Sequence, residues 1–151
     1  MRKKLSEQQI TEKLRKRCVK LAKELAKQRD NHTCCYCGVG KPQRVVHSHH
    51  IFSEGLNKSM SSDIDNLITL CWIHHLGGLK FVSTRNFSFH GSPSDATEWV
   101  KSNYPSRYRE LHQRSLKPTP CDMIYWQKRL EQLNNISEEN GQGNTRGGYQ
   151  D

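Results

Sequence analysis

The sequence predicts a small α+β fold in which a metal-binding core lies between N- and C-terminal helices. Only 33% of the 151 residues are hydrophobic, so we expect one small core that a bound metal helps to stabilise. Most cysteines and histidines fall within residues 31–91, whereas apolar residues on either side recur at helical spacing. We therefore divide the chain into a basic helix (1–30), a metal-binding core (31–91), a helical extension (92–134) and a Gly/Asn/Gln-rich disordered tail (135–151).

The first segment is expected to be a basic amphipathic helix over residues 7–29. Ser6 and Gln9 have the spacing of a capping box. The apolar stripe consists of Ile10, Leu14, Cys18, Leu21 and Leu25. Residues 1–30 hold eleven Lys or Arg and four acidic residues, a net +7 of the chain's +9. This block favours a polyanionic partner, most simply nucleic acid; the alternative is a merely solvated helix face.

Within the core we expect a strand over residues 44–48, a Ser/Asn/Gly-rich loop over 53–62, and a short helix from about Asp65. That helix would carry Cys71 to His75, with Asn66 near its beginning.

The extension is expected to be helical. Ser92-Pro93-Ser94-Asp95 is a helix start, because proline is tolerated in a first turn and aspartate is favourable there. Trp99 and Val100 would then face inward, and Pro105 begins another segment. A last helix begins at residues 119–122. Its apolar residues are Ile124, Leu130 and Leu133.

Membrane and disulfide-rich classes are disfavoured. The chain has no apolar run of about 18 residues, and its basic N-terminus lacks an apolar leader segment. We expect a cytoplasmic protein whose six cysteines are thiols or metal ligands rather than disulfides.

Two half-sites of equal spacing predict a structural zinc. Cys34 and Cys37 form a C-x-x-C knuckle, and Gly38 permits the tight turn that follows. Cys71 and His74 repeat the spacing, with 33 residues between the two pairs. The alternative, a set of buried thiols, fits poorly with three cysteines in four residues of a chain so short of apolar residues.

A rival pairing joins Cys34 and Cys37 to His47 and His50, but its spacing departs from that of a zinc finger. It also leaves His75 without a role. If His74 binds zinc, His75 points about 100° away on a helix and needs other partners.

Those partners lie in the His47–Ile51 segment. In a strand, His47 and His49 share one face and His50 lies on the other. A second metal at His49 and His75 would leave His50 offset, as a base that approaches water rather than the ion.

Together these motifs resemble the zinc-containing HNH nucleases, which have the ββα-metal fold. The resemblance covers residues 31–90: C-x-x-C, then His-His-Ile, Asn-Leu and Leu-Cys-x-x-His-His. The later stretches "FSFHGSP" and "RYRELHQRSL" are similar to phage-encoded NinG/Rap-like recombination nucleases.

The resemblance implies a metal-dependent DNA endonuclease or nickase. It implies structural Zn²⁺ at Cys34, Cys37, Cys71 and His74. It implies catalytic Mg²⁺ or Mn²⁺ at His49 and His75, with His50 as general base and Asn66 as a further catalytic residue. The third ligand of the catalytic ion is left open among His47, His90 and water.

The expected partner is DNA, duplex or branched. Phosphate contacts are predicted at Lys13, Arg17, Lys20, Arg44, Lys58, Lys80 and Arg85. A recombination role predicts branched DNA, and a homing role predicts one long sequence. Two other classes compete: a non-catalytic zinc-stabilised DNA-binding module, and a redox regulator that uses Cys34 and Cys37. Oligomeric state is not decided by the sequence.

Overall fold

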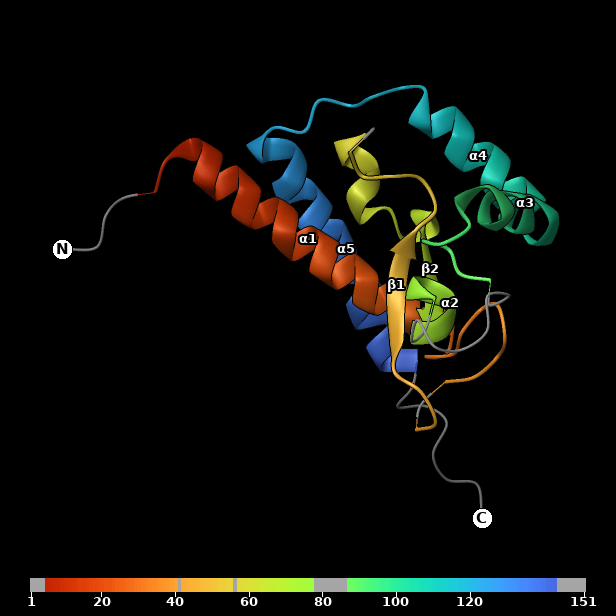
Figure 1. Ribbon diagram of the computed structural model, residues 1–151. Coiled ribbons are helices and arrows are strands. Elements are labelled where there is room, and N and C mark those ends of the chain that lie inside the picture. Colours follow the sequence, from red (N-terminus) through yellow and green to blue (C-terminus); the bar gives the residue numbers. More distant parts are fainter. Residues whose placement is uncertain (1–4, 41, 56, 78–86, 144–151) are drawn as a thin grey trace, which may run out of the picture.

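A computed structural model describes residues 5–40, 42–55, 57–77 and 87–143, and Figure 1 shows its arrangement. The elements in chain order are α1 (Glu7–Arg29), β1 (Val46–His50), the 3-10 helices η1 (Lys58–Ser62) and η2 (Ile64–Asn66), β2 (Leu67–Cys71), α2 (Trp72–Leu76), α3 (Pro93–Asn103), α4 (Pro105–Ser115) and α5 (Met123–Gly143). The predicted α+β class is therefore correct. No helix among these elements has the length and apolar character needed to cross a membrane.

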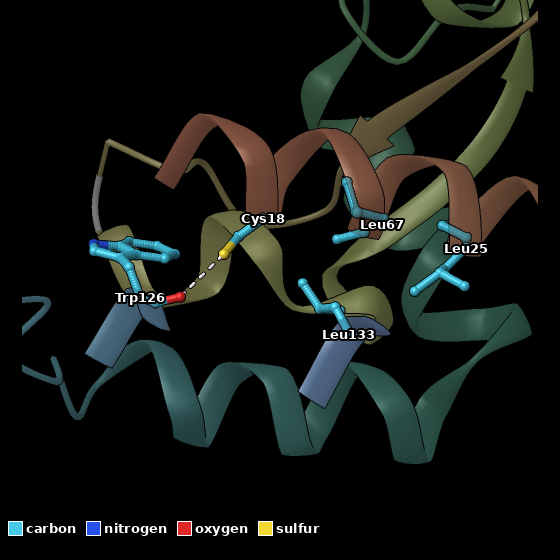
Figure 2. Packing of buried hydrophobic residues seen from close by; sticks show 7 residues of the cluster. Cys18, Leu25, Leu67, Trp126 and Leu133 are labelled. Atoms are coloured by element: carbon cyan, nitrogen blue, oxygen red, sulfur yellow. Dashed lines mark hydrogen bonds between the residues drawn. The ribbon is translucent and has the colours of Figure 1, made fainter. Parts of the chain in front are cut away.

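Helix α1 begins and packs as its sequence predicts. The Ser6 hydroxyl accepts a hydrogen bond from the Gln9 backbone, and the Gln9 side chain accepts one from the Ser6 backbone. The stripe packs on α5, which runs beside α1 (Figures 1 and 2). Cys18 is fully buried, and its thiol donates to the Trp126 carbonyl at 3.4 Å. Ile10 is still 37% exposed, so the buried stripe begins after it.

The sheet has two antiparallel strands, and β2 corrects a prediction. Residues 67–71 were expected to be helical, yet all five form a strand and all are buried. Leu67 packs into the cluster between α1 and α5, whereas Ile68 and Leu70 join a second cluster with Val100 of α3. A strand covered on both faces has no polar alternation, so its sequence does not separate strand from helix. Helix α2 begins only at Trp72.

Strand β1 runs from Val46 to His50, two residues later than predicted. His47 pairs with Leu70 and His49 pairs with Ile68, so both histidines share one face. Ser48 lies on the opposite face, where its hydroxyl donates to the Lys23 carbonyl of α1 at 2.8 Å. The predicted separation of His47 and His49 from His50 is confirmed.

The C-terminal helices begin at the predicted signals, but the last helix is longer. Helix α5 continues to Gly143, although the segment after residue 134 was predicted to be disordered. Ile136 packs against the α1–α5 cluster, which extends the helix beyond its expected end. Leu133 is fully buried, whereas Ile124 is 57% exposed and lies outside the core. Residues 144–151 are outside the described residues.

Candidate metal centres

Three cysteines and a histidine from separate parts of the chain form the first cluster. Cys34 and Cys37 come from the loop after α1, Cys71 ends β2, and His74 lies on α2. Their ligand atoms all lie within 4.8 Å of one another. This is the predicted Cys₃His set, and the rival pairing with His47 and His50 is not assembled.

Local backbone geometry brings the first two sulfurs together. The Gly38 N–H donates to the Cys34 carbonyl at 2.7 Å, and Gly38 has a left-handed φ of +72° that suits glycine. At Gly40, an added Cβ atom would lie 2.4 Å from the His32 carbonyl oxygen, so a larger residue would force the backbone to shift. The Cys35 N–H donates to the Thr69 carbonyl at 2.8 Å, which ties the knuckle to β2.

The distances between donors fit one tetrahedral ion. At zinc bond lengths of ~2.3 Å to sulfur and ~2.0 Å to nitrogen, two sulfurs lie ~3.8 Å apart and a sulfur lies ~3.6 Å from a nitrogen. Cys37 and Cys71 Sγ are 3.9 Å apart, and His74 Nδ1 lies 3.6 Å from Cys34 Sγ and 3.3 Å from Cys71 Sγ. The cluster could hold a metal ion, and its donors are those of structural zinc.

The thiols sit in contrasting electrostatic environments. Burial raises the pKa of Cys34 to about 11. Burial would also raise the pKa of Cys71, but hydrogen bonds from the His74 backbone and the Arg44 guanidinium outweigh it and lower that pKa. A bound cation would hold both sulfurs as thiolates.

A second cluster contains three histidines. His49 lies on β1, His75 on α2, and His90 just before α3, and their ligand atoms lie within 4.8 Å of one another. The Phe89 N–H donates to the His74 carbonyl at 2.8 Å and the His90 N–H to the His75 carbonyl at 3.2 Å. These backbone bonds hold His90 beside α2.

Adjacent nitrogens on one ion at ~2.1 Å lie ~3.0 Å apart in octahedral and ~3.4 Å apart in tetrahedral geometry. The Nε2 atoms of His75 and His90 are 3.2 Å apart. His75 Nδ1 is buried and makes no hydrogen bond within the described residues. The three imidazoles thus fit a shared cation. The His47 ring stacks on His75 with centroids 5.5 Å apart but is not in the cluster.

The two half-buried imidazoles of this cluster, those of His49 and His75, are neutral at pH 7. Burial lowers the pKa of His49 to about 3, helped by the nearby charges of His75 and His90. Burial, followed by the charge of His90, lowers the pKa of His75 to about 4. Neutral imidazoles keep the lone pairs that a metal needs.

His50 and Asn66 lie beside this cluster rather than in it. His50 Nε2 donates to the Ser61 carbonyl at 2.9 Å. Asn66 is fully buried, and its amide nitrogen donates to the carbonyls of Phe52 and Met60 at 2.9 and 3.1 Å. Its side-chain oxygen accepts from the Phe52 N–H at 2.8 Å. Asn66 therefore clamps the loop after His50. It directly precedes the strand β2, whereas the sequence had placed it near the start of a helix.

The predicted phosphate contacts are spread over the molecule. Lys13, Arg17 and Lys20 are exposed on α1 with helical spacing. Arg44 is exposed in the loop before β1, with its guanidinium 3.9 Å from Cys71 Sγ. Lys58 is exposed on η1, and its charge helps to lower the pKa of Glu12, so it lies by the N-terminal half of α1. Lys80 and Arg85 are outside the described residues.

One cation near the histidine cluster was not singled out from the sequence. The charge of Lys23 on α1 contributes to the lowered pKa of His75. Lys23 lines a groove with Lys16, Lys20 and Lys27 on the same helix. Helical periodicity groups these lysines, but only the docking of α1 on β1 brings Lys23 to the histidines.

Comparisons with protein-family models, curated proteins and solved structures find no match to this chain.

Proposed function

We propose that this protein is a metal-dependent DNA endonuclease of the HNH type, which hydrolyses phosphodiester bonds. One observation carries the proposal: a closed Cys₃His set adjoins a partly open cluster of three imidazoles, and β1, β2 and α2 supply four of their seven ligands. Structural zinc sites use four protein ligands, whereas catalytic metal sites keep positions for water or substrate.

His49, His75 and His90 would hold the catalytic ion. When bound, a divalent ion supplies positive charge to the scissile phosphate and to the leaving oxygen. Mg²⁺ prefers an oxygen shell, whereas imidazole nitrogens suit Mn²⁺ and other transition ions better. Of the two expected catalytic ions, the histidine donor set therefore favours Mn²⁺.

His50 would act as the general base. Because its Nε2–H donates to the Ser61 carbonyl, its Nδ1 carries the lone pair that accepts a proton from water. Its charge is the smallest of the contributions that lower the pKa of His49, its neighbour in β1. Asn66 is a positioning residue, since it holds the loop between His50 and η1. A positioned base typically accelerates a reaction ~10²–10⁴-fold.

DNA as substrate is supported by charge. A groove along α1 is lined by five basic side chains and by Glu24 and Glu54, and its lysines offer contacts to a phosphate backbone without reading bases. A phage-encoded role in recombination on branched DNA, or a homing role, is proposed from the motif resemblance alone.

The test is nicking of supercoiled plasmid and of a labelled four-way junction with Mg²⁺ or Mn²⁺. Wild type is compared with His50→Ala and with His112→Ala, which removes an exposed histidine of α4. We expect wild type and His112→Ala to cut, and His50→Ala to lose ~10²-fold or more. Faster cutting of the junction would support the recombination role.

If wild type binds DNA but cuts with none of several divalent ions, the enzyme proposal fails. A non-catalytic zinc-stabilised DNA-binding module would then be the better account of the Cys₃His set and the basic helix.

A further inference from the structure

An exposed aromatic groove lies next to the histidine cluster. Its lining residues are Arg44, Val45, His47, Trp72 and Ile73, and its cavity volume is about 470 Å³. Val45 is 63% exposed and Trp72 is 40% exposed. These solvent-exposed apolar side chains are large for a chain with so small a core.

The groove is continuous with the candidate catalytic centre. Trp72 and His75 are three residues apart on α2, so their side chains lie on neighbouring parts of one helix face. His47 lines the groove, and its ring stacks on that of His75 at 5.5 Å with 25° between the planes. A molecule whose phosphate lies at the histidine cluster would have its adjoining parts at Trp72.

The charge beside the aromatic ring suits an anionic strand. Arg44 borders the groove and its guanidinium is held 3.9 Å from Cys71 Sγ. Among the described residues, none that lines the groove is acidic. A flat aromatic face next to a fixed guanidinium is the arrangement that binds a base and its phosphate together.

We propose that this groove receives an unpaired nucleobase of the DNA strand being cut, by stacking on Trp72. In a duplex both faces of a base are already covered by its neighbours, so only an unstacked base offers a free face. The substrate class is therefore DNA with unpaired nucleotides at the cleavage position, such as a flap, a branch point or a single strand. This inference rests on the proposed nuclease function and narrows it.

A second copy of this chain is the less suitable occupant. In a two-fold contact the same patch meets itself, which would bring Arg44 of one copy towards Arg44 of the other. The like charges would oppose that contact, whereas a phosphate would neutralise each arginine.

The test measures binding by fluorescence anisotropy with no divalent ion added, so binding is separated from cleavage. The probes are a labelled single-stranded oligonucleotide, an abasic oligonucleotide of equal length, and a blunt duplex. The variants are Trp72→Ala, Trp72→Phe, which keeps an aromatic face, and Leu76→Ala, which truncates a 54%-exposed residue one turn along α2.

We expect Trp72→Ala to weaken binding of the base-containing strand by about 5- to 150-fold, with little change for the abasic strand or the duplex. Trp72→Phe should keep most of the affinity and Leu76→Ala all of it. Equal losses on the base-containing and abasic strands, or no loss at all, would overturn the stacking role while leaving the nuclease proposal intact. So would a dimer of the wild type that Trp72→Ala converts to a monomer. Failure of the wild type to bind any DNA would overturn both proposals.

Discussion

At the residue scale, two neighbouring histidines belong to two different sites. His74 Nδ1 lies 3.3 Å from Cys71 Sγ, whereas His75 Nε2 lies 3.2 Å from His90 Nε2. Successive residues on a helix diverge by about 100°, so a single turn of α2 can serve both clusters. The two clusters should therefore respond separately to substitution.

Substitution of each histidine tests this division. We expect His75→Ala to retain one tightly bound zinc, and His74→Ala to lose it and to unfold at lower temperature, since one of four donors is missing. His74→Cys should restore zinc, because a Cys₄ set is also a structural zinc site. The measurements are the zinc content of each variant after dialysis against a weak chelator and its thermal unfolding temperature. Equal zinc loss in His74→Ala and His75→Ala would refute separate sites.

Asp30 predicts a pH dependence of stability. Its carboxylate accepts hydrogen bonds from the Arg29 side chain and from the Thr69 N–H, and its side chain is only 10% exposed. Burial would raise the pKa of Asp30, but these hydrogen bonds outweigh it and lower the pKa below 3.8. Because the folded-state pKa is the lower one, the stabilisation is present above pH ~3.8 and is lost as pH falls through the folded value.

We expect Asp30→Asn to lower the free energy of unfolding by about 1.5–3 kcal/mol at pH 7, the usual range for a hydrogen-bonded charged group. The difference in unfolding free energy between Asp30→Asn and wild type should shrink below pH ~3.8. Urea unfolding of both proteins over this pH range provides the measurement, and any zinc release in acid affects both. A difference that stays constant down to pH 3 would show that the charge of Asp30 is not the cause.

Residue spacing predicted part of the site and missed part of it. The Cys₃His set follows from two equal spacings, and the opposed faces of His49 and His50 follow from the alternation of a strand. From the sequence, His90 was one of several candidates for the third ligand of the catalytic ion. It lies 15 positions beyond His75, and only backbone hydrogen bonds to α2 bring it to the site. The contribution of Lys23 to the lowered pKa of His75 depends on the packing of α1 against β1, which no local pattern encodes.

At the element scale, the predictable segments are those with one buried face. Helix α1 has a cap and a stripe, so its limits follow from local chemistry. Strand β2 is buried on both faces, so its strand character depends on pairing with β1 rather than on its own residues. The last turns of α5 likewise depend on a distant contact, that of Ile136 with the α1–α5 cluster.

Two apolar residues of α5 test how the helix packs. Leu133 is fully buried, so Leu133→Ala should lower the free energy of unfolding by ~2–5 kcal/mol through lost burial and the cavity it leaves. Ile124 is 57% exposed, so Ile124→Ala should change it by no more than ~0.5 kcal/mol. Chemical denaturation compares the two. A similar loss at both positions would mean that α5 does not pack on α1 through the Leu133 face.

At the scale of the whole molecule, α1 and α5 support the sheet on one side and the two candidate metal centres lie towards α2 (Figure 1). A zinc ion bound by the Cys₃His set would join the loop after α1 to β2 and α2. This link would stabilise a fold whose core has few apolar residues. The same docking of α1 brings Lys23 near the histidine cluster. The helix that supports the sheet thus also carries a lysine proposed to contact a polyanion.

A catalytic metal at the histidine cluster, as we propose, makes nicking depend on His75, and a single rate comparison examines this dependence. It is the rate of Mn²⁺-dependent nicking of supercoiled plasmid by His75→Ala and by His112→Ala, each with zinc content and unfolding temperature equal to those of wild type. We expect His75→Ala to lose nearly all activity and His112→Ala to keep it. Nicking by His75→Ala at the wild-type rate would contradict the claim.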